Sequence, residues 1–227
     1  KSTTMNMLTG YISSSSGEAL INDINILDNP IQAKREIGYL PELPPLYQEM
    51  TVMGYLRFVY DLKKCKLPRK AHLTEICNLC KISDVQDRII KNLSKGYRQR
   101  VGLAQAVLGF PEIIILDEPS VGLDPKQIIE IRELIRHLGE KHTVILSSHI
   151  LPEISAVCDH VFIISKGKLV ASDSTENLVN LMSGAQEIEL TVRTGAGEAA
   201  GYLQGEENIA RVEQADHDKI RIYAKKG

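Results

Sequence analysis

The run of apolar residues from 113 to 116 is the sequence feature that most restricts the fold. It reads Ile-Ile-Ile-Leu, and Asp117 and Glu118 follow it directly. Four successive aliphatic residues without polar alternation predict a strand buried on both faces, as in the middle of a parallel sheet. The runs at 144–146 and 161–164 predict further strands of this kind. Because a helical pattern separates the first two runs, the sequence predicts an α/β fold with a mostly parallel sheet flanked by helices.

The segment 51–110 differs from the rest because it shows helical periodicity and no convincing strand. Thr51 is placed to cap a helix that carries an apolar stripe. Two more helices are expected near 71–80 and 96–108. We therefore predict an all-α helical subdomain, at about residues 45–110, inserted into the α/β domain.

The C-terminal part of the chain differs from both the α/β segments and the helical segment, because its pattern is that of short strands and one short helix. Apolar and polar residues alternate at 188–192 and at 220–224, which predicts strands, and a short helix is expected near 198–203. The sequence thus predicts a main domain at 1–182 and the start of a small α+β accessory domain at 183–227.

The composition is that of an ordinary globular protein, with 43% hydrophobic and 25% charged residues. The net charge is −2, so no basic excess favours a nucleic-acid partner. No apolar run approaches the roughly 20 residues that cross a bilayer. We therefore expect any role at a membrane to depend on a partner protein.

Cys77 and Cys80 form a C-x-x-C pair, which has two interpretations. The pair could be half of a zinc site, but no second C-x-x-C follows it and His72 is the only histidine nearby. Alternatively, the cysteines belong to one apolar helix stripe together with Leu73 and Ile76. We prefer the apolar stripe and expect reduced cysteines.

Asp117 and Glu118 are placed where a buried strand of an open α/β sheet ends, which is where such sheets bind ligands. An aspartate there can hold Mg²⁺, and a glutamate can polarise a water molecule that attacks a phosphate. The alternative interpretation is that Asp117 and Glu118 are two solvated acidic residues at the end of a strand, without a role in catalysis. At the start of the chain, Lys1 and Ser2 match the end of the phosphate-binding motif G-x-x-x-x-G-K-[ST], a match that is weak by itself.

Three more short segments have a functional and a structural interpretation. Ser94 and Gly96 at a helix start could bind an anion or form a plain helix cap. A turn at 122–125 contains Asp124 and leads into another helix. His149 follows the strand at 144–146 and could contact a phosphate or serve as a structural hydrogen-bonding residue.

The order of these motifs resembles that of the ABC transporter ATPase, over about residues 1–182. It comprises the tail of a P-loop, a helical insert, Leu-Ser-x-Gly, Asp-Glu-Pro, Gly-Leu-Asp-Pro and Ser-Ser-His. The resemblance implies a P-loop NTPase-like fold, ATP and Mg²⁺ as cofactors, and an ATPase that energises transport. It implies that Lys1 contacts the β- and γ-phosphates, that Ser2 binds Mg²⁺ and that Thr3 is a neighbouring phosphate contact.

The same resemblance assigns roles to the later motifs. Asp117 is implied to bind Mg²⁺, Glu118 to be the catalytic base and His149 to sense the γ-phosphate. Ser94 and Gly96 resemble the signature segment that closes over ATP held by a second ATPase subunit. Asp124 resembles the residue that communicates across that dimer interface.

The chain departs from the family pattern in two places. In the signature segment, usually Leu-Ser-Gly-Gly-Gln, Lys95 and Tyr97 replace a glycine and the glutamine. Glu42 stands where the family generally has a glutamine that links Mg²⁺ and the attacking water to the transmembrane partner. A glutamate there can still bind Mg²⁺, and it resembles one exporter branch of the family.

The resemblance also implies an assembly. Two ATPase subunits would meet head to tail, and a transmembrane permease would dock on the helical insert around Leu56, Phe58 and Tyr60. The protein would then lie at the cytoplasmic face of the cell membrane, without a nucleic-acid partner. The alternatives are a soluble ABC ATPase that acts on nucleic acid or ribosomes and a regulatory subunit without activity, against which Glu118 argues. Because the chain begins within the Walker A motif, we expect residues 1–227 alone to bind ATP weakly and not to hydrolyse it.

Overall fold

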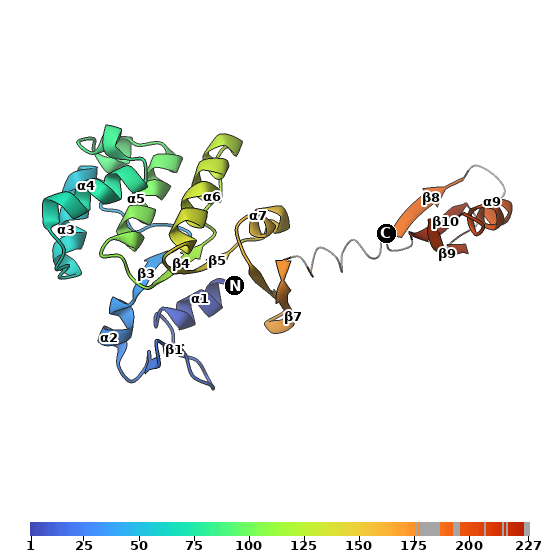
Figure 1. Ribbon diagram of the computed structural model, residues 1–227, viewed down its shortest axis with the longest axis horizontal. Coiled ribbons are helices and arrows are strands. Elements are labelled where there is room, and N and C mark those ends of the chain that lie inside the picture. Colours follow the sequence, from blue (N-terminus) through green and yellow to red (C-terminus); the bar gives the residue numbers. More distant parts are fainter. Residues whose placement is uncertain are drawn as a thin grey trace. The chain divides into compact units, whose positions relative to one another are not determined.

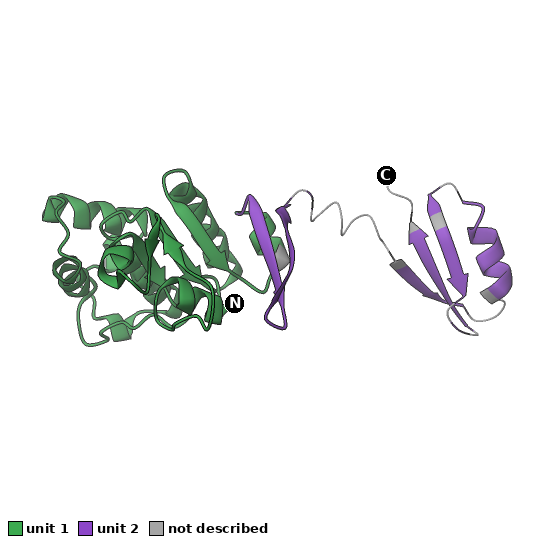
Figure 2. Cartoon of the chain, turned by 90° about the horizontal axis from the view of Figure 1, so that it is seen from below, with its two compact units in different colours: residues 1–157 green, residues 158–227 purple. Residues whose placement is uncertain are grey.

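The computed structural model describes residues 1–175, 177, 187–192, 196–206, 208–214, 216 and 218–224. The chain forms two compact units, Lys1–Val157 and Cys158–Gly227 (Figure 2), and each is described by itself. The boundary that the sequence predicts, between residues 182 and 183, lies outside the described residues. None of the helices in the described ranges combines the length and the apolar character that a membrane span requires.

A three-stranded parallel sheet forms the centre of the first unit. Its strand order is β3 (Ile37–Leu40), β4 (Ile113–Asp117) and β5 (Thr143–Ser147), with β4 in the middle. The side chains of Ile114, Ile115 and Leu116 in β4 are fully buried. The prediction of a central parallel strand is therefore confirmed, and the strand extends one residue further, to Asp117.

The two faces of β4 belong to different hydrophobic clusters. Ile114 and Leu116 pack in the larger cluster with the helices of the insert and with α6 (Pro125–Gly139). Ile115 points to the other face and packs in a smaller cluster with Met5 of α1 (Ser2–Leu8) and with Ala33 of α2 (Pro30–Arg35). A hairpin of β1 (Leu20–Ile21) and β2 (Ile24–Asn25) completes this smaller cluster. The sheet is thus covered on both faces, as Figure 1 shows.

The segment between β3 and β4 is helical, as the sequence predicts. It contains α3 (Val52–Leu62), α4 (Arg69–Leu79) and α5 (Lys95–Val107), with short 3₁₀ turns at Ser83–Val85 and Ile90–Asn92. The hydroxyl of Thr51 accepts a hydrogen bond from the backbone N–H of Gly54 at 3.1 Å and so caps α3.

Helix α5 packs directly against β3, the strand that leads to Glu42. A Cβ atom at Gly38 would lie 2.2 Å from the carbonyl oxygen of Ala106. A Cβ atom at Gly102 would lie 2.8 Å from the side chains of Leu40 and Pro44. Only glycine at these two positions permits the close packing of helix and strand.

Two elements follow β4 and position the other site residues. Helix α6 begins after Asp124, whose side chain accepts a hydrogen bond from the backbone N–H of Gln127 at 2.9 Å. Its apolar stripe of Ile131, Ile135 and Leu138 is buried against the larger cluster. The short helix α7 (Leu151–Ser155) follows β5 and ends the first unit.

The second unit contains a hairpin and a small α+β element. In the hairpin, β6 (His160–Ser165) pairs antiparallel with β7 (Lys168–Ser174). The prediction that 161–164 forms a strand buried on both faces is wrong. Phe162 is 64% exposed, because β6 belongs to a two-stranded antiparallel ribbon and not to the central sheet.

The α+β element has the sheet order β8 (Glu187–Thr191), β10 (Lys219–Ala224) and β9 (Ile209–Gln214). Both outer strands run antiparallel to β10. Helix α9 (Ala196–Leu203) packs on Val212, Ile220 and Ile222. The two predicted strands and the helix are present, and β9 is a strand that the sequence analysis missed.

Candidate functional site

Glu118 is the centre of a cluster at the carboxyl ends of β4 and β5. It follows β4 directly, is only 7% exposed, and has a positive φ of 49°. Its backbone N–H donates to the hydroxyl of Ser147 at 3.1 Å and to the carbonyl oxygen of Ser147 at 3.2 Å. A positive φ costs a non-glycine residue on the order of 1–3 kcal/mol. The end of β5 therefore holds Glu118 in a conformation that the isolated chain would avoid.

Two basic side chains bind the Glu118 carboxylate, one at each oxygen. Lys1 forms an ion pair with Oε1, and Nδ1 of His149 lies 2.9 Å from Oε2. The His149 side chain is 60% exposed, whereas that of Glu118 is 9% exposed. The carboxylate is thus almost enclosed, whereas both of its partners face solvent.

The surroundings of Glu118 change its acidity in two opposed ways. Burial by itself raises the pKa of the carboxyl group. The hydrogen bonds and positive charges of Lys1 and His149 outweigh burial, so the pKa of Glu118 lies below its ordinary value. The side chain is therefore ionised at neutral pH and can act as a base.

Asp117 lies beside Glu118 as the last residue of β4 and is 3% exposed. Its Oδ1 accepts a hydrogen bond from the hydroxyl of Ser147. The same hydroxyl accepts from the backbone N–H of Glu118, so Ser147 connects both acidic residues to β5. The sequence analysis gave Ser147 no role; its position at the end of an apolar run was the only signal.

The remaining predicted phosphate contacts lie on α1 and after β3. Lys1 is the N-cap residue of α1, and Ser2 and Thr3 form its first turn, where both are exposed. Glu42 is exposed and lies two residues beyond the end of β3, the neighbour of β4. In the described part of the chain, no hydrogen bond or ion pair joins Glu42 to Asp117 or Glu118.

Ser94, Gly96 and Asp124 form a second group, at the starts of α5 and α6. Ser94 caps α5 by accepting from the backbone N–H of Tyr97 at 3.3 Å. A Cβ atom at Gly96 would lie 2.4 Å from Oε1 of Gln127, the residue whose N–H the Asp124 carboxylate binds. The structure thus brings these three residues together, and it shows Ser94 and Asp124 as helix caps.

The two unusual signature residues have partners of their own. The hydroxyl of Tyr97 donates to Oδ2 of Asp84 at 2.6 Å, which connects the start of α5 to the 3₁₀ turn at Ser83–Val85. The Lys95 side chain lies over Gly122, because a Cβ atom there would be 2.0 Å from its Nζ. Local contacts therefore accommodate both Lys95 and Tyr97 in the signature segment.

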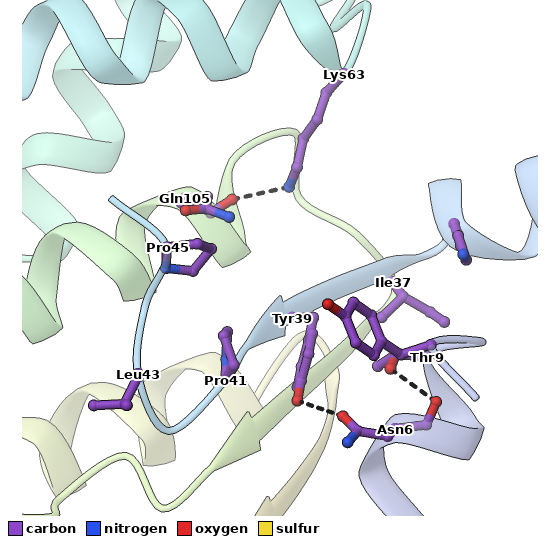
Figure 3. Close-up of a pocket in the computed structure, with 11 residues that line it drawn as sticks. Asn6, Thr9, Ile37, Tyr39, Pro41, Leu43, Pro45, Lys63 and Gln105 are labelled. Atoms are coloured by element: carbon purple, nitrogen blue, oxygen red, sulfur yellow. Dashed lines mark hydrogen bonds between the residues drawn. The ribbon is translucent and has the colours of Figure 1, made fainter. Parts of the chain in front are cut away.

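A cavity of about 540 Å³ lies beside β3 and the segment that follows it (Figure 3). Pro41 and Leu43, the neighbours of Glu42, both line it. The Tyr39 hydroxyl in its wall hydrogen-bonds to Asn6 Oδ1 at 3.3 Å. The lining contains none of the predicted phosphate or metal contacts, so the cavity flanks the Glu42 segment and is separate from the Glu118 cluster.

An exposed apolar patch continues from this segment onto α3. It comprises Leu43, Tyr47, Phe58 and Leu62, which are 81%, 55%, 39% and 69% exposed. The rings of Tyr47 and Phe58 are in contact, with centroids 5.2 Å apart. Of the three residues that the sequence suggested for docking, only Phe58 is exposed; Leu56 and Tyr60 are buried in the core of the insert.

Cys77 and Cys80 belong to the large hydrophobic cluster, and both are 1% exposed. Burial raises the pKa of both thiols. His72 is also buried, and its Nε2 accepts from the backbone N–H of Gly109 at 2.9 Å. The described residues contain no cluster of three or more potential metal ligands among histidine, cysteine, aspartate and glutamate. The predicted packing of Cys77 and Cys80 in one apolar stripe is confirmed, because Leu73 and Ile76 are buried in the same cluster.

Comparison with known proteins is consistent with this geometry. The sequence profile of the ABC transporter family matches residues 1–121. The chain belongs to the ABC transporter family. The bacitracin transport ATP-binding protein BcrA of Bacillus licheniformis is 32% identical over 229 residues, which cover 100% of this chain and 73% of BcrA.

Two further similarities extend this result. An uncharacterized ABC transporter ATP-binding protein of a Synechocystis species is 33% identical over 211 residues, covering 89% of this chain. The match spans only 57% of that relative's length. A solved structure of an ATP-binding subunit of an ABC transporter superposes with a TM-score of 0.71 at 27% identity, over 80% of this chain and 77% of that one. The predicted α/β fold of the ABC ATPase is thereby confirmed.

Proposed function

We propose that the protein containing this chain is the ATP-hydrolysing subunit of an ABC transporter. The observation that carries the proposal is the Glu118 carboxylate, held between Lys1 and His149 beside the buried Asp117. A base, a cation and a proton-carrying ring at one sheet edge suit the transfer of a phosphoryl group to water. The membership of the chain in the ABC transporter family supports this reaction class.

In the proposed reaction, Glu118 accepts a proton from the attacking water through its carboxylate, which its lowered pKa keeps ionised. Lys1 binds the β- and γ-phosphates of ATP, so the nucleotide competes with Glu118 for its ammonium group. Ser2 and Thr3 add contacts at the start of α1. His149 holds Glu118 through its Nδ1 and places its exposed ring toward the γ-phosphate.

The proposed cofactor is Mg²⁺, bound by Asp117, Ser2 and Glu42. All three offer oxygen atoms, the ligands that Mg²⁺ prefers. Asp117 is the last residue of β4, and Glu42 follows the neighbouring strand β3. When bound, the ion neutralises charge that develops on the phosphate oxygens. Ser147 orients Asp117 for this task by its hydrogen bond to Oδ1.

The proposed assembly contains a second copy of the subunit. Ser94, Gly96 and Asp124 lie together at the starts of α5 and α6, and no hydrogen bond or ion pair in the described part of the chain joins them to Glu118. We propose that Ser94 and Gly96 complete the nucleotide site of the other subunit and that Asp124 lies at the interface. ATP then stabilises the dimer and its hydrolysis loosens it.

The proposed membrane partner is a permease subunit at the cytoplasmic face of the membrane. The exposed patch of Leu43, Tyr47, Phe58 and Leu62 offers apolar contact area next to Glu42. A permease segment bound there would be coupled to the metal site through Glu42. The glutamate at this position supports export as the direction of transport.

Steady-state release of phosphate tests the proposal. Wild type, Glu118→Gln and the matched control Glu133→Gln, an exposed glutamate of α6, are compared in the gene product that contains this chain. Removal of the base should lower kcat by about 10²- to 10⁴-fold, and the control should retain wild-type activity. Equal activity of all three proteins would reject the role of Glu118.

The expected weak ATP binding of residues 1–227 alone stays a prediction, which calorimetric titration would check.

A further inference from the structure

Glu153 of α7 is a nearly buried carboxylate, only 6% exposed, that contacts three separate segments of the first unit. Its Oε2 accepts a hydrogen bond from the Ser120 hydroxyl at 2.5 Å and lies 3.5 Å from the Ser148 hydroxyl. Its Oε1 lies 3.5 Å from Nη2 of Arg132 in α6. Glu153 thus joins the loop after β4, helix α6 and the segment after β5.

The two serines have a defined relation to the Glu118–His149 pair. Ser120 is two residues after Glu118, and Ser148 immediately precedes His149. The Ser148 hydroxyl also accepts from the backbone N–H of Ile150 at 3.1 Å, so it fixes the turn on the other side of His149. One carboxylate therefore binds both segments that must keep Glu118 and His149 at their 2.9 Å separation.

The charge of Glu153 makes this arrangement sensitive to substitution. A carboxylate that is nearly removed from water requires a cation and hydrogen-bond donors. Arg132 supplies the cation, and its own buried Nε has no hydrogen-bond partner among the described residues. Nε of Arg132 thus stays unpaired even with Glu153 present, and loss of the carboxylate would also remove the ion-pair partner of Nη2.

We propose that Glu153 is a positioning residue for ATP hydrolysis, which it supports by holding Ser120 and Ser148 and thereby the Glu118–His149 pair. The inference rests on the proposed function, because it assigns a role within that reaction. Glu153 touches neither Glu118 nor His149 directly in the described contacts, so its effect passes through the two serines. A displacement of about 1 Å in such a pair can cost about a hundredfold in rate.

The test compares Glu153→Gln with Glu133→Gln in the gene product that contains this chain. Glu153→Gln should lower kcat by about tenfold to a hundredfold with an unchanged KM for ATP. Glu133→Gln should leave both kcat and KM at their wild-type values. Glu153→Gln should also lower the melting temperature, because Arg132 loses its ion-pair partner. The double variant Arg132→Met/Glu153→Gln removes both charges, so it should regain the wild-type melting temperature while kcat stays low. Recovery of kcat together with the melting temperature would overturn the proposal, because the role would then be structural only.

A second readout does not depend on hydrolysis. The ring ¹⁵N resonances of His149, assigned with a His149→Gln variant, should move in Glu153→Gln and stay in place in Glu133→Gln. Unmoved resonances in folded Glu153→Gln would overturn the proposal. If wild type lacks ATPase activity, the proposed function fails. The His149 resonances then show by themselves whether Glu153 holds His149 in position. If Glu153→Gln does not fold, Ser120→Ala and Ser148→Ala replace it, and their kcat and His149 resonances are compared with those of Glu133→Gln.

Discussion

Nδ1 of His149 lies 2.9 Å from Oε2 of Glu118, although 30 residues separate the two in the sequence. The contact exists because β4 and β5 are adjacent parallel strands whose carboxyl ends meet at one edge of the sheet. Ser147 pairs with Asp117 in this register and fixes the backbone of Glu118. The register of the buried strand β4 against its half-buried neighbour β5 thus sets the geometry of the candidate catalytic pair.

The acid stability of the protein should depend on Glu118. Its pKa is lower in the folded state than in the unfolded chain, so it contributes stability above the ordinary glutamate pKa of about 4.3. That contribution is lost as the pH falls through the lowered value. Urea unfolding between pH 6 and pH 3 should show a steeper loss of unfolding free energy for wild type than for Glu118→Gln. Parallel curves would contradict this prediction.

Ser147→Ala should weaken both the fold and the site. The substitution removes the hydroxyl, one of the two acceptors of the Glu118 N–H, and with it the donor to Asp117. Both of these hydroxyl hydrogen bonds are buried. We expect a loss of about 1–3 kcal/mol in unfolding free energy and reduced ATP hydrolysis. Ser165→Ala, at an exposed position in β6, is the control and should change neither quantity. Chemical denaturation and a phosphate-release assay check the two effects.

A side chain at Gly122 should destabilise the fold. Its φ of 68° disfavours other residues, and a Cβ atom would meet the ammonium group of Lys95. We expect Gly122→Ala to lower the unfolding free energy by about 1–2 kcal/mol. Gly139→Ala is the matched control, because a Cβ atom there meets nothing within 4 Å and no positive φ is required. Gly139→Ala should leave the unfolding free energy unchanged or raise it by up to about 1 kcal/mol. If Gly139→Ala destabilises the protein as much as Gly122→Ala does, the prediction is contradicted.

The cysteines should differ in reactivity. Cys77 and Cys80 are buried with raised pKa values, whereas Cys65 is half-buried. A thiol reagent at pH 8 should modify Cys65 well before Cys77 or Cys80, since the thiolate is the reactive form. Mass spectrometry of digested protein identifies the order. Early modification of Cys77 or Cys80 would contradict their burial. Stoichiometric zinc binding would favour the metal interpretation of the pair.

The sequence was sufficient where one local pattern decided the structure. The unbroken run of aliphatic residues predicted β4, and the acidic residues after it predicted the site at its end. The cap at Thr51 and the insert helices were also predicted, because capping and periodicity are local properties. The same pattern failed for residues 161–164, because an apolar run does not show whether a strand enters the central sheet or a separate ribbon.

Features that depend on tertiary contacts were missed. Strand β9 carries Val212 between the polar residues Arg211 and Glu213, so one buried side chain gave too weak an alternation. Ser147 owes its role to hydrogen bonds with residues 29 and 30 positions away. Glu153 owes its role in part to Ser120, which lies 33 positions away. No local pattern predicts such partners.

The central claim is that Glu118 activates water at a nucleotide site completed by a second copy of the chain. The most direct measurement is native mass spectrometry of Glu118→Gln in the gene product that contains this chain, incubated with Mg²⁺ and ATP. The account predicts a dimer that holds two intact ATP molecules, whereas wild type should release ADP and return to monomers. A Glu118→Gln protein that remains monomeric, or that carries only ADP, would contradict the account.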